Sequence, residues 1–249
     1  MGLLDGDTAL ITGAASGIGR GIARALAAEG VRLVLSDIAE EAGRAIAQEL
    51  GAAFVPADLT APGAAQRLFD AAADALGTVS IFVHCASPRR HERETALAVS
   101  EAEWDAMVTV GLRSGFLLGQ AAGRHMQDRN IKGRMIFITS LHAWSPRNLP
   151  HYSATKAGQT MVVKELARAL GPAGIRVNAV APGAIPGGGF NADVAALEKM
   201  IPLGRTGTPD DVAGMAVALL CDRFSRYVTG TTVAVDGGIA LFNWIPAAT

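Results

Sequence analysis

The chain contains only two cysteines, Cys85 and Cys221, among 249 residues. Two cysteines cannot supply the disulfide framework of a small secreted domain, so we expect a reducing, cytoplasmic environment. No apolar run reaches the length of about 18 residues that a membrane-spanning helix needs. Residues 1–7 lack a basic segment followed by an apolar one, and we therefore expect no signal peptide.

The sequence also lacks a strong charge of either sign. Its 22 lysines and arginines nearly balance its 23 acidic residues, which leaves a formal net charge of −1. A nearly neutral chain gives no support for nucleic-acid binding. No internal repeat, charge run or low-complexity tract is present. Because 50% of the residues are hydrophobic, the composition predicts one globular α/β domain over residues 1–249 with a large core.

Strand-like and helix-like segments alternate along the chain, which is typical of an α/β protein. We expect strands at 8–12, 32–36, 53–57, 80–83, 133–140, 175–180 and 232–235. We expect helices opening near 18 and spanning 40–50, 64–76, 101–127, 152–170 and 209–221.

A glycine-rich turn joins the first strand to the first helix and contains Gly13, Gly17 and Gly19. Glycines at such a turn allow a tight bend, close approach to a pyrophosphate and close packing of helix on strand. The N–H groups and the dipole at the following helix N-terminus attract phosphate. The position of the turn inside a βαβ unit therefore predicts a dinucleotide site.

Two aspartates follow the second and third strands. Asp37 stands about 20 residues after the glycine turn, where a carboxylate accepts hydrogen bonds from the adenosine ribose. It would repel a 2′-phosphate, and neither Ser16 nor Ile38 offers a cation to receive one, so we expect NAD rather than NADP. The alternative role for Asp37 is a helix cap. Asp58 is placed to contact the adenine, and its alternative role is a turn or N-cap residue.

The fourth strand leads into a turn of small residues, 84–88, where sheets of this kind bind ligands. We interpret His84 as structural and Cys85 as a packing residue, because no partner base for a nucleophile is identifiable. The polar segment 88–100 is rich in arginine and glutamate and indicates a surface loop. Ser100 with Glu103 resembles a helix capping box.

Tyr152 and Lys156 stand four residues apart in a segment that we expect to be helical, so they share one face of the helix. A tyrosine alone is a poor acid or base near pH 7, but a nearby ammonium favours its phenolate. The pair could then move a proton. Ser140, at the end of an apolar run, could hydrogen-bond the same substrate oxygen. An isolated pair of this spacing is usually an ordinary surface feature, so its interpretation depends on the rest of the chain.

Taken together, these pieces resemble the short-chain dehydrogenase/reductase family in its single-domain form, over nearly the whole chain. The matching pieces are Thr12-Gly13-x-x-x-Gly17-Ile18-Gly19, Asp37, Asp58, Ser140, Tyr152-x-x-x-Lys156, Arg176-Val177-Asn178, Pro182-Gly183 and Asp236-Gly237-Gly238. The resemblance implies a Rossmann-type, doubly wound, seven-stranded parallel sheet in the order 3-2-1-4-5-6-7. Helices would cover both faces, and the usual assembly would be a homotetramer.

The resemblance also implies roles for individual residues. Tyr152 would be the general acid/base, Lys156 would favour its phenolate and bind the nicotinamide ribose, and Ser140 would hold the substrate oxygen. The implied cofactor-binding residues are Gly13, Ser16, Gly17, Ile18, Gly19, Asp37, Asp58, Leu59, Cys85, Ala86, Tyr152, Lys156, Pro182, Gly183 and Ile185. The cofactor would carry the hydride.

Residues expected to touch the substrate are His142, Trp144, Asn148, 186–190 with Phe190, and 242–244. The glycines of 187–189 indicate that 186–203 is either a lid over the substrate or a plain flexible loop. We expect no metal site.

Four departures from the family pattern stand out. His84-Cys85-Ala86-Ser87 replaces the usual Asn-Asn-Ala-Gly, and Gly111 replaces a mid-helix asparagine. Ser140 precedes Tyr152 by 12 positions, one fewer than is common, so Thr139 or Ser145 could share its role. A carboxamide-binding threonine is replaced near Gly187. We hypothesise a widened turn at Gly111, with a carbonyl facing Lys156, and we expect Gly111→Asn to be tolerated.

The leading interpretation is an NAD-dependent oxidoreductase that transfers a hydride between the cofactor and a secondary alcohol or ketone, a polyol or a sugar. One alternative is an NADP-dependent 3-oxoacyl-thioester ketoreductase, against which Asp37 speaks. The other is a non-catalytic dinucleotide-binding sensor, suggested by Gly111 and the altered 84–87 turn. The expected partners are a small-molecule substrate and further copies of the chain, with no nucleic acid and no membrane.

Overall fold

The computed structural model describes residues 2–187 and 193–241. The strands are β1 (Thr8–Thr12), β2 (Arg32–Asp37), β3 (Ala53–Pro56), β4 (Ile81–His84), β5 (Arg134–Ile138), β6 (Arg176–Pro182) and β7 (Thr232–Val235). The helices are α1 (Gly17–Ala28), α2 (Glu40–Leu50), α3 (Ala64–Leu76), α4 (Glu101–Met107), α5 (Ser114–Asp128), α6 (Pro150–Leu170), α7 (Val194–Glu198), α8 (Pro209–Leu220) and α9 (Asp222–Ser225). A π-helical turn, η1 (Val108–Arg113), and three 3₁₀ turns, η2 (Leu141–Ala143), η3 (Gly171–Ala173) and η4 (Ile239–Leu241), complete them.

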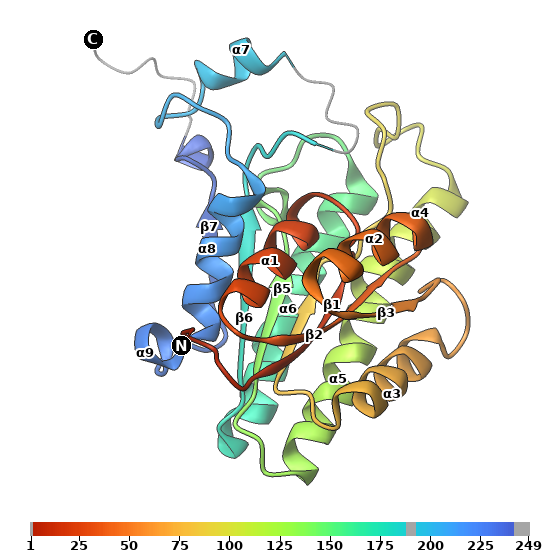
Figure 1. The fold of residues 1–249 in the computed structure, drawn as a ribbon. Coiled ribbons are helices and arrows are strands. Elements are labelled where there is room, and N and C mark those ends of the chain that lie inside the picture. The colour runs from red at the N-terminus through yellow and green to blue at the C-terminus, as the bar shows by residue number, and fades with distance from the viewer. Residues whose placement is uncertain (1, 188–192, 242–249) are drawn as a thin grey trace.

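The strands form one seven-stranded sheet in the order β3-β2-β1-β4-β5-β6-β7 (Figure 1). Every neighbouring pair is parallel. The expected Rossmann-type fold is therefore confirmed. Because the order reverses between β1 and β4, the turns that follow these two strands flank a crevice at the carboxyl edge of the sheet.

Alternate residues of the central strands point into two separate cores. Leu10, Phe82 and Phe137 pack under α3, α5 and α6. Their neighbours Ile11 and Val83 pack on the other face, under α1, α2 and α8. Figure 1 shows α1 and α2 in front of the sheet. Burial on both faces explains why the strands read as continuous apolar runs rather than alternating ones.

Two parts of the chain differ from the sequence-based expectation. The helix expected over 101–127 is divided into α4, η1 and α5, with the π turn at Gly111. Its start agrees, because Ser100 and Glu103 form the expected capping box. The 88–100 loop is only partly a surface loop, since the side chain of Glu94 is 3% exposed.

The expected substrate loop, 186–203, contains α7, while Phe190 and residues 242–244 lie outside the described residues. Among the helices of the described residues, none is long and apolar enough to cross a membrane. The same residues contain no cluster of three or more side chains that could hold a metal ion.

Candidate functional site

The glycine turn after β1 touches the turn after β4. A Cβ on Gly13 would stand 2.7 Å from the Ala86 nitrogen, so only glycine allows this approach. Gly13 and Gly17 have φ values of 68° and 51°, in the left-handed region that glycine adopts most easily. A Cβ on Gly19 would collide with the Gly13 carbonyl. The three glycines thus shape a cradle of bare backbone at the N-terminus of α1.

Asp37 borders this cradle from the end of β2. One carboxylate oxygen accepts from the Ala15 nitrogen at 3.0 Å, and the other accepts from the Ala39 nitrogen at 3.0 Å. Asp37 is therefore fixed beside the glycine turn, and its alternative role as a helix cap is not observed, because the N-cap of α2 is Ala39 and no side chain caps that helix. Asp58 forms a turn, because it accepts from the nitrogen and hydroxyl of Thr60 at 2.9 Å and 2.6 Å.

His84 links β1 to the π turn through both of its ring nitrogens. Nδ1 lies 3.0 Å from Thr12 Oγ1, and Nε2 lies 3.0 Å from the Gly111 carbonyl oxygen. A carbonyl only accepts, so Nε2 donates and Nδ1 accepts from the hydroxyl. Burial lowers the pKa of His84 to about 4, and the nearby Lys156 ammonium acts in the same direction. A neutral histidine therefore bridges the two elements at pH 7.

Cys85, next along the chain, is held by backbone rather than by a base. Its nitrogen donates to the Thr12 carbonyl at 3.2 Å. Burial raises the pKa of the Cys85 thiol to about 11, so the thiol stays protonated near pH 7. A protonated thiol is a poor nucleophile, which agrees with a packing role.

Tyr152 and Lys156 occupy the first turns of α6, which opens with Pro150. Their side chains are buried, at 7% and 3% exposure. The Lys156 ammonium lies 5.6 Å from the centroid of the Tyr152 ring and donates to the Ile138 carbonyl at 2.8 Å. Burial lowers the pKa of Lys156, while Tyr152 acts in the opposite direction. The two groups form an enclosed pair and not a surface feature.

Ser140 follows β5 and begins the short turn η2, where its hydroxyl accepts from the His142 nitrogen at 3.2 Å. The His142 ring stands 6.3 Å from the Tyr152 ring, centroid to centroid. The segment from Ile138 to His142 thus lies against the Tyr152–Lys156 pair. Thr139 points elsewhere, since its hydroxyl donates to the Val180 carbonyl at 3.1 Å. Ser140 is consequently the better placed of the two hydroxyls.

Gly111 lies in the expected widened turn, but its carbonyl does not serve Lys156. That oxygen accepts from His84 Nε2 at 3.0 Å and from Gln159 Nε2 at 2.9 Å. The carbonyl of Gly111 itself is therefore not the one that the hypothesis requires, because the ring N–H of His84 and the side-chain amide of Gln159 already occupy its oxygen.

The steric surroundings of Gly111 argue against the expected tolerance of Gly111→Asn. A Cβ at position 111 would stand 2.5 Å from Cγ2 of Thr155, whose residue is 0% exposed. Threonine in a helix has two common χ1 rotamers, so the methyl can leave only by exchanging places with the hydroxyl. Thr155 lies between Tyr152 and Lys156 on α6, and the clash would therefore reach the helix that carries this pair.

The 88–100 loop is docked onto the segment that opens α6. Glu92 pairs with Arg147 at 2.7 Å, and Glu94 pairs with His151 at 2.9 Å inside the protein. These contacts were not expected from the sequence. The only signal was the excess of arginine and glutamate in the loop, which equally describes a solvated surface.

Only some of the residues expected to contact substrate lie near the Tyr152–Lys156 pair. His142 faces Tyr152, as described above, and its Nδ1 lies 2.8 Å from the Ser145 carbonyl. Asn148 is turned to the 88–100 loop, where its side-chain oxygen accepts from the Ala96 nitrogen at 3.1 Å. Trp144 is 49% exposed.

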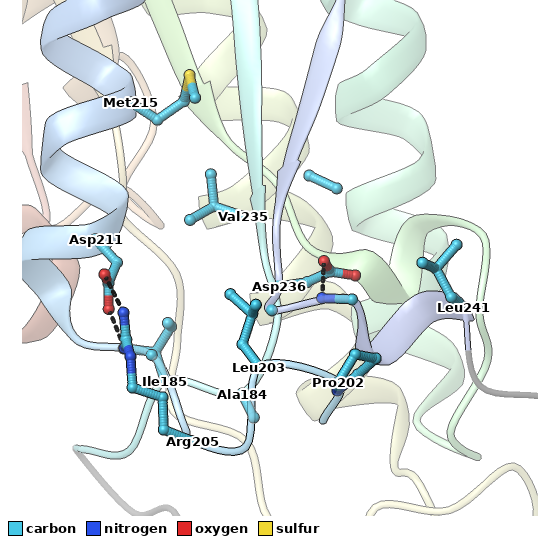
Figure 2. Close-up of a pocket in the computed structure, with 14 residues that line it drawn as sticks. Ala184, Ile185, Pro202, Leu203, Arg205, Asp211, Met215, Val235, Asp236 and Leu241 are labelled. Carbon is cyan, nitrogen blue, oxygen red and sulfur yellow. Dashed lines mark hydrogen bonds and ion pairs between the residues drawn. The ribbon is translucent and has the colours of Figure 1, made fainter. Parts of the chain in front are cut away.

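A separate cavity of about 500 Å³ lies beyond the ends of β6 and β7 (Figure 2). Its wall includes the ion pair of Arg205 and Asp211, at 2.7 Å. Ile185 lines it, but the Ser140, Tyr152 and Lys156 side chains do not. The expected cofactor turn reaches its edge, since Gly183 packs so closely on Asp236 that a Cβ would stand 2.7 Å from the Asp236 Cα. The cavity is thus distinct from the Tyr152 site.

Similar proteins point to one family. A family model described as Enoyl-(Acyl carrier protein) reductase matches residues 13–240. A 3beta-hydroxysteroid dehydrogenase 1 of Eggerthella lenta is 38% identical, with 96% of this chain and 95% of the relative covered. An L-rhamnose 1-dehydrogenase (NAD(P)(+)) of Azotobacter vinelandii is 37% identical, with 95% and 98% covered.

A solved structure supports the same relationship. The 3-ketoacyl-(acyl-carrier-protein) reductase of Brucella melitensis, complexed with NADH, superposes with a TM-score of 0.88. It is 33% identical, and the match covers 95% of this chain and 99% of that one.

We expect Gly111→Asn to lower the free energy of unfolding by about 1–3 kcal/mol, the usual cost of overpacking a core. The reason is the contact between the new Cβ and the Thr155 methyl. Urea denaturation of the single variants Gly111→Asn and Thr155→Ser and of the double variant would measure it. Thr155→Ser removes only the methyl, so the double variant should recover most of the loss. Full stability of Gly111→Asn alone would contradict the steric argument.

We expect His84 to make the fold less stable as the pH falls from about 6.5 to about 4. The unfolded chain binds the imidazole proton at the ordinary pKa, whereas the folded chain resists it, so acid favours unfolding by roughly 2 kcal/mol. Urea denaturation between pH 7.5 and pH 4.5 on wild type and His84→Asn would test this. The variant should show the flatter dependence, and identical slopes would rule out the buried neutral histidine.

Proposed function

The chain belongs to the short-chain dehydrogenase/reductase family and is an oxidoreductase that uses a pyridine nucleotide, and on this premise we propose its specific activity. We propose an NAD-dependent dehydrogenase acting on a secondary alcohol, with the reverse ketone reduction as its counterpart. The observation that carries the proposal is the buried Tyr152–Lys156 pair, with the ammonium 5.6 Å from the phenol ring and Ser140 in the segment beside it.

The residues at the carboxyl edge of the sheet fit a dinucleotide. Gly13 and Gly19 let the turn pack tightly on the protein's own backbone, a Cβ on Gly17 would enter open space, and the α1 N-terminus can donate N–H groups to phosphate. Asp37 can still accept ribose hydroxyls, since each carboxylate oxygen offers a further lone pair. When bound, the nicotinamide supplies the hydride acceptor or donor for the reaction.

The chain's own contribution to the chemistry is proton handling and orientation. In alcohol oxidation the Tyr152 phenolate takes the proton of the substrate hydroxyl and becomes the phenol, and the Lys156 ammonium stabilises that phenolate in a site that excludes water. The Ser140 hydroxyl donates a hydrogen bond to the substrate oxygen. The carbonyl of Ile138 holds the ammonium in place at 2.8 Å.

The preference for NAD over NADP rests on Asp37. Its carboxylate is fixed at the glycine turn by the Ala15 nitrogen, so it cannot withdraw from a 2′-phosphate without losing that hydrogen bond. We also propose a homotetramer in the cytoplasm, as the family resemblance and the two free cysteines suggest. The segment 186–203 would act as the substrate loop.

The second candidate is reduction of a 3-oxoacyl thioester, which the similarity to the Brucella melitensis reductase supports. Assays with NADH or NADPH on acetoacetyl thioesters and on a panel of alcohols, sugars and cyclic ketones would separate the two. A dinucleotide-binding protein without turnover is less favoured. Burying the Lys156 ammonium costs free energy, and a protein that only binds the dinucleotide gives no reason for that cost.

We expect Tyr152→Phe to lower kcat by about 10²–10⁴ while NADH still binds. The ring and its packing remain, and only the proton-carrying hydroxyl is lost. Steady-state kinetics on a confirmed substrate and fluorescence titration with NADH would measure the two properties. Tyr227, which is fully exposed at 101%, offers the control Tyr227→Phe, which should behave like wild type. Retention of most activity in Tyr152→Phe would reject the assignment.

We expect wild type to have the higher kcat/KM with NAD, and Asp37→Ala to reduce that preference. The variant removes the charge that repels a 2′-phosphate, although it also frees the Ala15 nitrogen. Measuring kcat/KM for both cofactors with one substrate would test it. Asp58→Ala is the matched control and should keep the wild-type ratio, because among the described residues the carboxylate of this neighbouring aspartate accepts from Thr60 and not from the glycine turn. A wild-type preference for NADP would overturn the proposal.

A further inference from the structure

Arg90 lies over the ring of Tyr152, with its guanidinium carbon 4.4 Å from the ring centroid. This distance is within the range of about 6 Å for a cation–π contact. The guanidinium also lies near enough to Lys156 to oppose its protonation. A permanent positive charge therefore stands beside the hydroxyl to which we assign proton transfer.

Nearby acidic side chains do not neutralise Arg90. In the 88–100 loop, Glu92 pairs with Arg147 and Glu94 pairs with His151, and on α4 Glu103 pairs with Arg93. Within residues 2–187 and 193–241, the guanidinium of Arg90 has no hydrogen bond or ion pair to protein. The N–H groups of Arg90 are thus available to donate to an anion that does not belong to the described residues.

The loop that carries Arg90 is held in place at three points. The Glu92–Arg147 and Glu94–His151 pairs and the Ala96–Asn148 hydrogen bond all join it to residues 147–151. Glu94 and His151 are 3% and 1% exposed, so this joint lies in the interior. Because residues 147–151 run directly into Tyr152, the loop and the tyrosine are positioned together. The cation is therefore presented before any ligand arrives, which reduces the entropy cost of binding.

We propose that Arg90 binds a carboxylate carried by the substrate, so that the substrate class is hydroxy acids and the corresponding keto acids. The inference rests on the proposed function and narrows its substrate. A guanidinium binds a carboxylate through two parallel hydrogen bonds of about 2.7–2.9 Å. Since Arg90 stacks on the reacting tyrosine itself, the carboxylate lies close to the carbinol carbon and not at the far end of a long chain. A neutral sugar has no negative charge to pair with the Arg90 guanidinium.

Binding is tested first, without turnover. Malonate and its neutral counterpart malonamide are titrated calorimetrically into the NADH-saturated enzyme, in wild type, Arg90→Gln and Arg89→Gln. Arg89 is the matched control, because it is the adjacent arginine and is exposed. We expect malonate to bind wild type and Arg89→Gln at least about tenfold more tightly than it binds Arg90→Gln. Malonate binding that is absent from wild type, or unchanged in Arg90→Gln, would overturn the proposal.

Turnover is tested with a matched pair of secondary alcohols, 3-hydroxybutyrate and its methyl ester. We expect wild type to favour the acid in kcat/KM, and Arg90→Gln to lower the ratio of acid to ester about tenfold or more, with Arg90→Lys between them. Because the ester has no carboxylate, a change in its kcat/KM in the Arg90 variants reports an effect of Arg90 on Tyr152 itself. Preference for the ester in wild type would overturn the carboxylate assignment and leave the dehydrogenase intact. Arg90-dependent malonate binding in a protein that oxidises no alcohol would support the anion site and reject the dehydrogenase.

Discussion

The buried ammonium of Lys156 is the constraint on which the candidate site depends. Moving an ammonium out of water costs several kcal/mol unless polar partners replace the water. Here the Ile138 carbonyl, at the end of β5, accepts from it at 2.8 Å, and the Tyr152 ring faces it at 5.6 Å. This contact requires the carboxyl end of β5 to lie beside the first turns of α6. The parallel sheet achieves this because every strand ends at the same edge.

The same edge explains how the chain accommodates a glycine where a polar side chain is common in its family. Without a side chain at position 111, the π turn packs directly against Thr155. Its carbonyl is satisfied by His84 and Gln159, which reach it from β4 and α6. The two departures from the family pattern, at positions 84 and 111, therefore depend on each other. A neutral His84 on β4 links Thr12 of β1 to the Gly111 carbonyl of η1. Any route by which a proton leaves Lys156 must avoid this occupied carbonyl.

The 88–100 loop is fastened to the start of α6, so on our proposal it would couple substrate recognition to the helix that carries Tyr152 and Lys156. Its buried Glu94–His151 contact lies next to Tyr152 in sequence, and its Arg90 lies over the Tyr152 ring in space. A loop of this composition exposes most of its side chains, yet one carboxylate is fully enclosed. Such a carboxylate is tolerated only with a partner, and His151 is that partner. The consequence is a fixed positive group over the Tyr152 ring.

The sequence alone determined the order of strands and helices, because buried parallel strands and their helices have distinct apolar patterns and capping signals. Motif spacing also brought Tyr152 and Lys156 onto one helical face. Spacing along the chain could not reveal that Gly111 abuts Thr155, that His84 reaches Gly111, or that Arg90 stacks on Tyr152. These contacts join residues far apart in sequence, so their geometry exists only once the sheet and its helices have packed. Tertiary structure therefore decided which charges remain available to a substrate.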